Sequence, residues 1–177
     1  MKTIDKYLFQ ALDNYPFWLE GTIESLDYAF SYDPKNTMIL CLYGRIQAEQ
    51  LMNYEEAKSY FQEALSINIH ALEVYPHYLH TLILNEDYDE AQKLIDFALT
   101  IKGINKSGIY IKKAVLLEVQ HKFKEALKEI KQAKLYSIQH DYDSGISEAE
   151  KRIKDKIELL KKKKSKKSKK DSKKKSK

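Results

Sequence analysis

The stretch Asn-Tyr-Glu-Glu-Ala at residues 53–57 recurs 34 residues later as Asp-Tyr-Asp-Glu-Ala at residues 87–91. The apolar residues that follow the two stretches keep the same displacement: Phe61, Ala64, Leu65 and Ile67 in the first copy, and Ile95, Ala98, Leu99 and Ile101 in the second. A third copy begins at Phe123, displaced by a further 35 residues, and a weaker copy lies upstream between Thr22 and Pro34. A fixed period of this length is typical of helical repeat proteins.

The recurring apolar positions lie on one face of a helix. Ala57, Phe61 and Ala64 are spaced i, i+4 and i+7, so they share a side, and the small alanines allow a second helix to approach closely. Asn53 precedes this helix and Glu56 follows three residues later, a capping-box arrangement that the second copy repeats and that predicts where each helix begins. Another apolar-periodic stretch lies upstream of each block, so each unit is expected to be a pair of helices.

At these positions the chain resembles the tetratricopeptide repeat (TPR) family, whose units are pairs of helices. In that family the second helix carries an alanine, a large apolar residue and another alanine at fixed positions, and three copies match: Ala57/Phe61/Ala64, Ala91/Ile95/Ala98 and Ala126/Ile130/Ala133. An aromatic residue three positions before the first alanine is also matched, by Tyr54, Tyr88 and Phe123. The family's glycine on the first helix is replaced by Arg45, Leu79 and Ala114. The resemblance covers roughly residues 3–138.

Together these features predict an all-α chain built as a right-handed α-solenoid of about four TPR-like helix pairs. A further apolar stripe, formed by Ile146, Ala149, Ile153, Ile157 and Leu160, predicts a helix that caps the exposed end of the last pair. Beyond it the chain contains only Lys, Ser and one Asp, a composition typical of disorder. The expected organisation is therefore TPR-like repeats over residues 1–138, a capping helix over 139–163 and a disordered polybasic tail over 164–177.

The pattern also gives approximate bounds for the helices. We expect helices over residues 3–13, from Pro16 to about Tyr32, over 37–51, over 54–67, from Glu73 or Val74 onward, and over 88–101, 109–120 and 123–138. Pro16 and Pro76 are placed in the first turn of their helices, where the missing N–H costs nothing.

Charge and composition narrow the classes of function. The chain carries a net +5, but residues 161–177 hold 12 Lys and one Asp, which leaves the remaining 160 residues at −6. The single cysteine, Cys41, permits no intrachain disulfide and favours a reducing compartment, so a cytoplasmic protein is expected. No signal peptide and no transmembrane segment is evident.

No constellation points to catalysis. The chain contains no Gly-rich phosphate loop, no G-x-S-x-G and no H-E-x-x-H, so neither an enzyme nor a cofactor is expected. His77 and His80 are three residues apart on an expected helix, but no third ligand for zinc lies nearby, and surface or groove polar residues are the simpler interpretation. Cys41 is expected to be a buried, inert thiol, because no histidine is placed to activate it.

The resemblance implies a concave groove, lined by the first helices of successive units, that holds a partner segment. The matching positions are Leu42, Ile46, Glu49, Gln50, Glu73, His77, His80, Ile83, Ile111, Lys112, Val115 and Glu118. An alternative for Leu42, Ile46 and Val115 is that they pack between helices. The version of the groove that clamps a C-terminal carboxylate does not fit, because Leu42 and Ile46 stand where its Lys and Asn would be.

These observations favour a non-catalytic protein–protein interaction adaptor or scaffold that binds a segment of an unidentified partner. The alternative is a nucleic-acid-associated protein whose tail binds polyanions, or another acidic surface, without regard to sequence. The expected contacts of that kind come from lysines at the start of the tail: Lys161, Lys162, Lys163, Lys164, Lys166, Lys167, Lys169 and Lys170.

Overall fold

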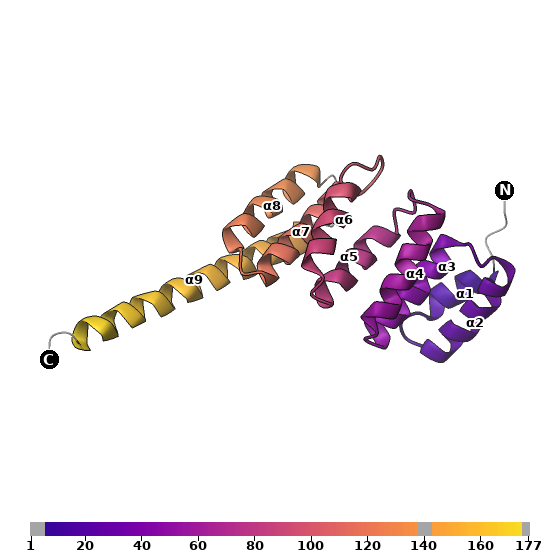
Figure 1. Cartoon of the computed structure of the whole chain (residues 1–177), viewed down its shortest axis with the longest axis horizontal. Helices are drawn as coiled ribbons and strands as arrows, with labels where there is room; N and C mark the ends of the chain where they lie inside the picture. Colours follow the sequence, from indigo (N-terminus) through magenta and orange to yellow (C-terminus); the bar gives the residue numbers. More distant parts are fainter. Residues whose placement is uncertain (1–5, 138–142, 175–177) are drawn as a thin grey trace. The chain divides into compact units, whose positions relative to one another are not determined.

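The computed structural model describes the backbone of residues 6–137 and 143–174, and the side chains of residues 6–137 and 145–162 (Figure 1). Over these residues the chain forms nine α-helices, one π-helical turn and no strand, which confirms the all-α prediction. The elements are α1 (Lys6–Asn14), α2 (Leu19–Tyr32), α3 (Thr37–Arg45), η1 (Ile46–Gln50), α4 (Tyr54–Ile67), α5 (Val74–Leu84), α6 (Tyr88–Ala98), α7 (Lys106–Val119), α8 (Phe123–Tyr136) and α9 (Asp143–Lys174).

The helices belong to two compact units, Met1–Ile104 and Asn105–Lys177. In the first unit α1 packs on α2, α3 on α4 and α5 on α6; in the second, α7 packs on α8 and α8 on α9. Helices that are consecutive in sequence therefore pack against each other, and α4 also packs on α5. The predicted solenoid and its number of repeats stay a prediction.

The recurring alanines make close packing possible in both units. Ala57, Ala64, Ala91 and Ala98 have no exposed surface in the first unit, and the same holds for their counterparts on α8. A close approach between α3 and α4 involves a glycine that the family pattern did not indicate. A Cβ added at Gly44 of α3 would lie 2.6 Å from the ring of Phe61 on α4, so only glycine leaves room for that buried ring.

Helix starts agree with the prediction in part. The side chain of Asn53 accepts a hydrogen bond from the backbone N–H of Glu56, as expected for a cap. Asp87 makes no such bond at the start of α6. Its carboxylate instead accepts hydrogen bonds from Lys58 of α4 and from Asn85, both at 2.7 Å. The predicted capping box at Asp87 is thus replaced by contacts that tie α6 to α4.

The two prolines behave differently. Pro76 lies in the first turn of α5, as predicted. Pro16 does not lie in the first turn of a helix, because α2 begins only at Leu19. The N–H groups of Phe17 and Trp18 both donate to the carbonyl of Asn14 and close a turn that follows α1. The peptide bond between Tyr15 and Pro16 in this turn is cis.

In the second unit, α9 covers the α7/α8 pair. Ile146, Ala149 and Ile153 are buried in the same cluster as Phe123, Ala126, Ile130 and Ala133 of α8 and Ala114 and Leu117 of α7. Ile157 packs at the edge of this cluster, whereas Leu160 remains 46% exposed. The apolar stripe of α9 therefore packs as predicted over most of its length and leaves its last residue uncovered.

Beyond residue 163 the structure describes backbone only, and the predicted disorder of residues 164–177 stays a prediction. The structure continues α9 as helix to Lys174 (Figure 1). No Gly or Pro follows Gly145, and Lys is among the better helix formers. The docked first half also provides the costly helix nucleus, from which each added residue extends the helix cheaply. Residues 175–177 lie outside the described residues.

We expect Ala91→Glu to lower the free energy of unfolding by several kcal/mol, because the substitution overpacks a fully buried site and places an unpaired charge there. Lys93→Glu on the exposed side of the same helix is the matched control and should change stability little. Chemical denaturation followed by circular dichroism measures both. Equal stabilities for the two variants would contradict the packing of α6 described above.

Candidate functional site

The structure separates the predicted groove residues into buried and accessible sets. Leu42, Ile46 and Ile83 are 1%, 2% and 6% exposed, so they pack in the core of the first unit and present no surface to a partner. For Leu42 and Ile46 this is the packing alternative considered above. The accessible residues of the first unit are Glu49, Gln50, Glu73, His77 and His80.

Glu49 is the centre of a polar cluster in the first unit. Its carboxylate accepts a hydrogen bond from the hydroxyl of Tyr15, which follows α1, and one of 3.4 Å from Nε of Arg45 at the end of α3. Nδ1 of His77 on α5 lies 3.6 Å from Oε1 of the same carboxylate. The guanidinium of Arg45 also stacks over the Tyr15 ring, 4.5 Å from its centroid. The cluster thus brings together two predicted residues, Glu49 and His77, and two that the sequence did not indicate.

The electrostatics of this cluster keep Glu49 charged. Partial burial of its carboxyl opposes ionisation, but the hydrogen bond from Tyr15 and the charge of Arg45 outweigh it and hold the pKa below its usual range. Burial, together with the hydrogen bond to Glu49, raises the pKa of Tyr15 to about 12. At neutral pH the cluster therefore contains a carboxylate and a hydroxyl that remains a donor.

Glu49 lies within the π-helical turn η1. The N–H of Leu51 donates to the carbonyl of Ile46, five residues earlier, and the N–H of Asn53 donates to that of Gln47. Such a widened turn shifts the side chains that follow it relative to an α-helix and is often found at functional sites. The apolar periodicity of this segment gave no sign of it, because Ile46 and Ala48 are buried as in an ordinary helix.

The chain's own α9 occupies part of the predicted surface in the second unit. Glu118 of α7 is only 4% exposed and receives both Nε and Nη2 of Arg152, at 3.0 and 2.8 Å. Nζ of Lys156 adds a third bond of 2.5 Å. Ile111 packs against the cluster that contains the apolar stripe of α9, and Lys112 and Val115 are half-buried.

The cations of α9 also determine the ionisation of Glu118. The hydrogen bonds from Arg152 lower its pKa, burial of the carboxyl opposes this, and Lys156 adds to the lowering. Glu118 is therefore ionised at neutral pH and fixes α9 to α7 through a forked ion pair.

The remaining predicted residues are placed as follows. Cys41 is buried, and burial raises the pKa of its thiol to about 12, so the reactive thiolate is not formed at neutral pH. Lys161 and Lys162 are exposed on α9. The predicted polyanion-binding residues from Lys163 to Lys170 lie on the helical backbone, and their side chains are outside the described set. No cluster of His, Cys, Asp and Glu among the described residues could hold a metal ion.

Compared with known proteins, the chain matches no protein-family model, and no curated protein is a significant match. The TPR resemblance therefore rests on the residues quoted above. In the part of the chain that the structure describes, no helix is both long enough and apolar enough to cross a membrane.

The ion pair at Glu118 predicts a defined pH dependence. The pKa of Glu118 is lowered in the folded state. The ion pair therefore stabilises the fold above the unfolded-state pKa of about 4.3, and this stabilisation is lost as the pH falls through the folded-state pKa. Glu118→Gln should lower the free energy of unfolding by about 1–3 kcal/mol at pH 7, and its difference from the parent should shrink below about pH 4. Glu158→Gln, at an exposed position of α9, is the control. Thermal melts across pH test this, and a difference that persists at low pH would contradict the charge-based account.

Proposed function

We propose that this chain is a non-catalytic adaptor of TPR-like helix pairs that binds a segment of a partner protein. The observation that supports this most is the polar cluster around Glu49, in which Glu49 of η1 and His77 of α5, two positions that correspond to the groove of TPR proteins, lie beside Arg45 of α3. Arg45, Glu49 and His77 are partly exposed and already held in place by their neighbours, so little entropy is lost when a partner binds. A cytoplasmic location is part of the proposal, supported by the single buried cysteine.

The charge of the first unit suggests the chemistry of the partner. Residues 1–104 hold sixteen acidic and seven basic side chains, a net charge of −9. Glu73, at the start of α5, is exposed, and Glu49 remains ionised. A segment that carries Lys or Arg, or that presents free backbone N–H groups, complements this surface.

The test compares two charge reversals of equal size. Glu73→Lys changes an accessible residue of the proposed surface, and Glu63→Lys changes an exposed residue on α4 outside it. A partner captured from the native source should bind the Glu73→Lys chain at least about tenfold more weakly by titration calorimetry, while Glu63→Lys should bind as the parent does. Equal effects of the two substitutions would mean that net charge, and not this surface, determines binding.

A second candidate function, sequence-independent polyanion binding, is supported by the course of α9. Residues 105–177 hold twenty-four basic and ten acidic side chains, a net charge of +14, and half of the basic residues follow Leu160. In a continuous helix, successive residues of this part of the chain rise by about 1.5 Å along the helix axis. This rise is close to the spacing of about 1.7 Å per charge along duplex DNA. Residues 161–177 contain no aromatic residue and no Arg to read bases.

For this second function, we expect the full chain to bind single-stranded RNA and anionic vesicles with an affinity that falls steeply between about 50 and 200 mM salt. A full-length variant in which every lysine after residue 160 is changed to glutamine should lose this binding, and helix propensity is nearly preserved. Binding that survives in this variant, or that strongly prefers one RNA sequence, would exclude the electrostatic mechanism.

A further inference from the structure

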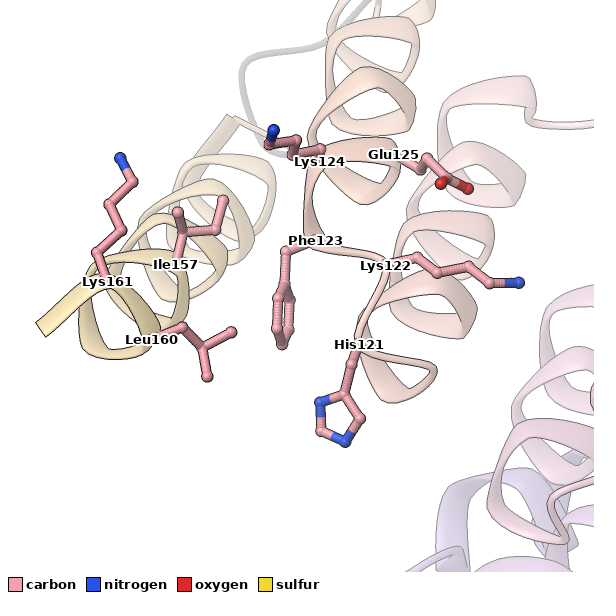
Figure 2. A pocket seen from close by; sticks show the side chains of 8 residues that line it. All are labelled: His121, Lys122, Phe123, Lys124, Glu125, Ile157, Leu160 and Lys161. Atoms are coloured by element: carbon pink, nitrogen blue, oxygen red, sulfur yellow. The ribbon is translucent and has the colours of Figure 1, made fainter. Parts of the chain in front are cut away.

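A cleft of about 570 Å³ opens in the second unit, where the start of α8 meets α9 (Figure 2). It is lined by His121, Lys122, Phe123, Lys124, Glu125, Ile157, Leu160 and Lys161. Figure 2 shows the rings of Phe123 and His121 and the side chain of Leu160 facing the same space. The groove prediction includes none of these residues, and the predicted role of the tail includes only Lys161.

The floor of the cleft is apolar and shaped by branched and aromatic side chains. Phe123 is 8% exposed, Ile157 is half-buried, and Leu160 keeps 46% of its surface exposed although it belongs to the apolar stripe of α9. The His121 ring meets Phe123 edge-to-face, with ring centroids 5.7 Å apart. An aliphatic side chain placed here would cover the exposed part of Leu160, and burial of a side chain of that size is strongly favourable.

The rim of the cleft is basic. Lys122, Lys124 and Lys161 form no ion pair with any carboxylate in the described part of the chain, and Glu125 is the single acidic residue in the lining. The cleft also lies at the N-terminus of α8, the positive end of the helix dipole. Lys122, at the cap position, provides no side-chain acceptor there, whereas Asn105 caps α7. Negative charge beside an apolar anchor therefore fits this cleft.

We propose that the cleft is a second docking site, separate from the surface around Glu49, and that its occupant is an acidic segment of a partner protein. One large aliphatic side chain of that segment fills the floor over Leu160 and Ile157, and flanking carboxylates meet the rim lysines. A nucleic acid would use the lysines, but the Phe123 ring is only 8% exposed, and the most accessible apolar group of the floor is the branched side chain of Leu160, which offers a base no flat surface to stack on.

The probe is a short fluorescein-labelled peptide of glutamates with one central leucine, compared with the same peptide carrying alanine at the centre. Fluorescence anisotropy is measured with the full chain at about 200 mM salt, where general attraction to the lysine tail is weakened. We expect the leucine peptide to bind at least about tenfold more tightly than the alanine peptide, the equivalent of about 1.4 kcal/mol.

Two pairs of variants locate the site. Leu160→Ser should abolish the preference for the leucine peptide. Leu159→Ser is the control, because Leu159 is 58% exposed and does not line the cleft, and it should leave the preference for the leucine peptide unchanged. Lys124→Glu should weaken binding of the leucine peptide severalfold, and Lys128→Glu, exposed on α8 outside the cleft, should weaken it less. Because these side chains are exposed, all four variants should melt close to the parent.

The outcomes decide the proposal in either direction. Equal binding of the two peptides would overturn it, and so would equal effects of Leu160→Ser and Leu159→Ser. It would also be overturned if RNA displaced the leucine peptide fully and bound the Leu160→Ser variant as tightly as the parent. Glu73→Lys should leave the peptide preference unchanged, so that failure of the site around Glu49 and failure of this cleft are distinguishable.

Discussion

Close approach between neighbouring helices is the constraint on which the rest of the structure depends. At Gly44 the backbone of α3 comes so near to the ring of Phe61 that any side chain would collide with it, and buried alanines allow the same closeness along α4, α6 and α8. Helix pairs packed in this way bury their apolar faces against each other and leave the ends of their helices accessible. The polar cluster and the basic-rimmed cleft both lie at such helix ends, which the packed pairs hold rigidly.

The repeated pattern predicted the helix pairs because it records burial. The bounds of α4 agree with the expected range, and the alanines of all three copies are buried. Prediction from neighbouring residues failed where a residue distant in the sequence competes for the same polar side chain. Asp87 would cap α6 on local grounds, but Lys58, 29 residues away, provides a stronger partner for its carboxylate.

The candidate site was predictable only in part, because its contacts join residues far apart in the sequence. Tyr15 and Glu49 are 34 residues apart, and so are Glu118 and Arg152. A prediction from the repeat period assigns the same environment to equivalent positions in successive units. Glu49 and Glu118 are such positions, yet Glu49 is partly exposed in a cluster and Glu118 is buried beneath α9. The burial of Ile83, a predicted groove residue, has the same origin: equivalent positions do not have equivalent neighbours. A π-helical turn adds a local change of register that no apolar pattern reports.

The opposite net charges of the two units affect every interaction proposed for this chain. An acidic unit of −9 and a basic one of +14 attract each other within one chain or between copies, and this attraction competes with any charged partner. Screening over about 8 Å at physiological ionic strength removes most of the long-range attraction and leaves the short-range contacts. A partner that places an apolar side chain over Leu160, or that forms hydrogen bonds at Glu49, therefore loses less affinity as salt rises than a competitor that binds through charge alone. On this argument, shape and hydrogen bonding provide specificity, and the charges of the two units set the rate of encounter.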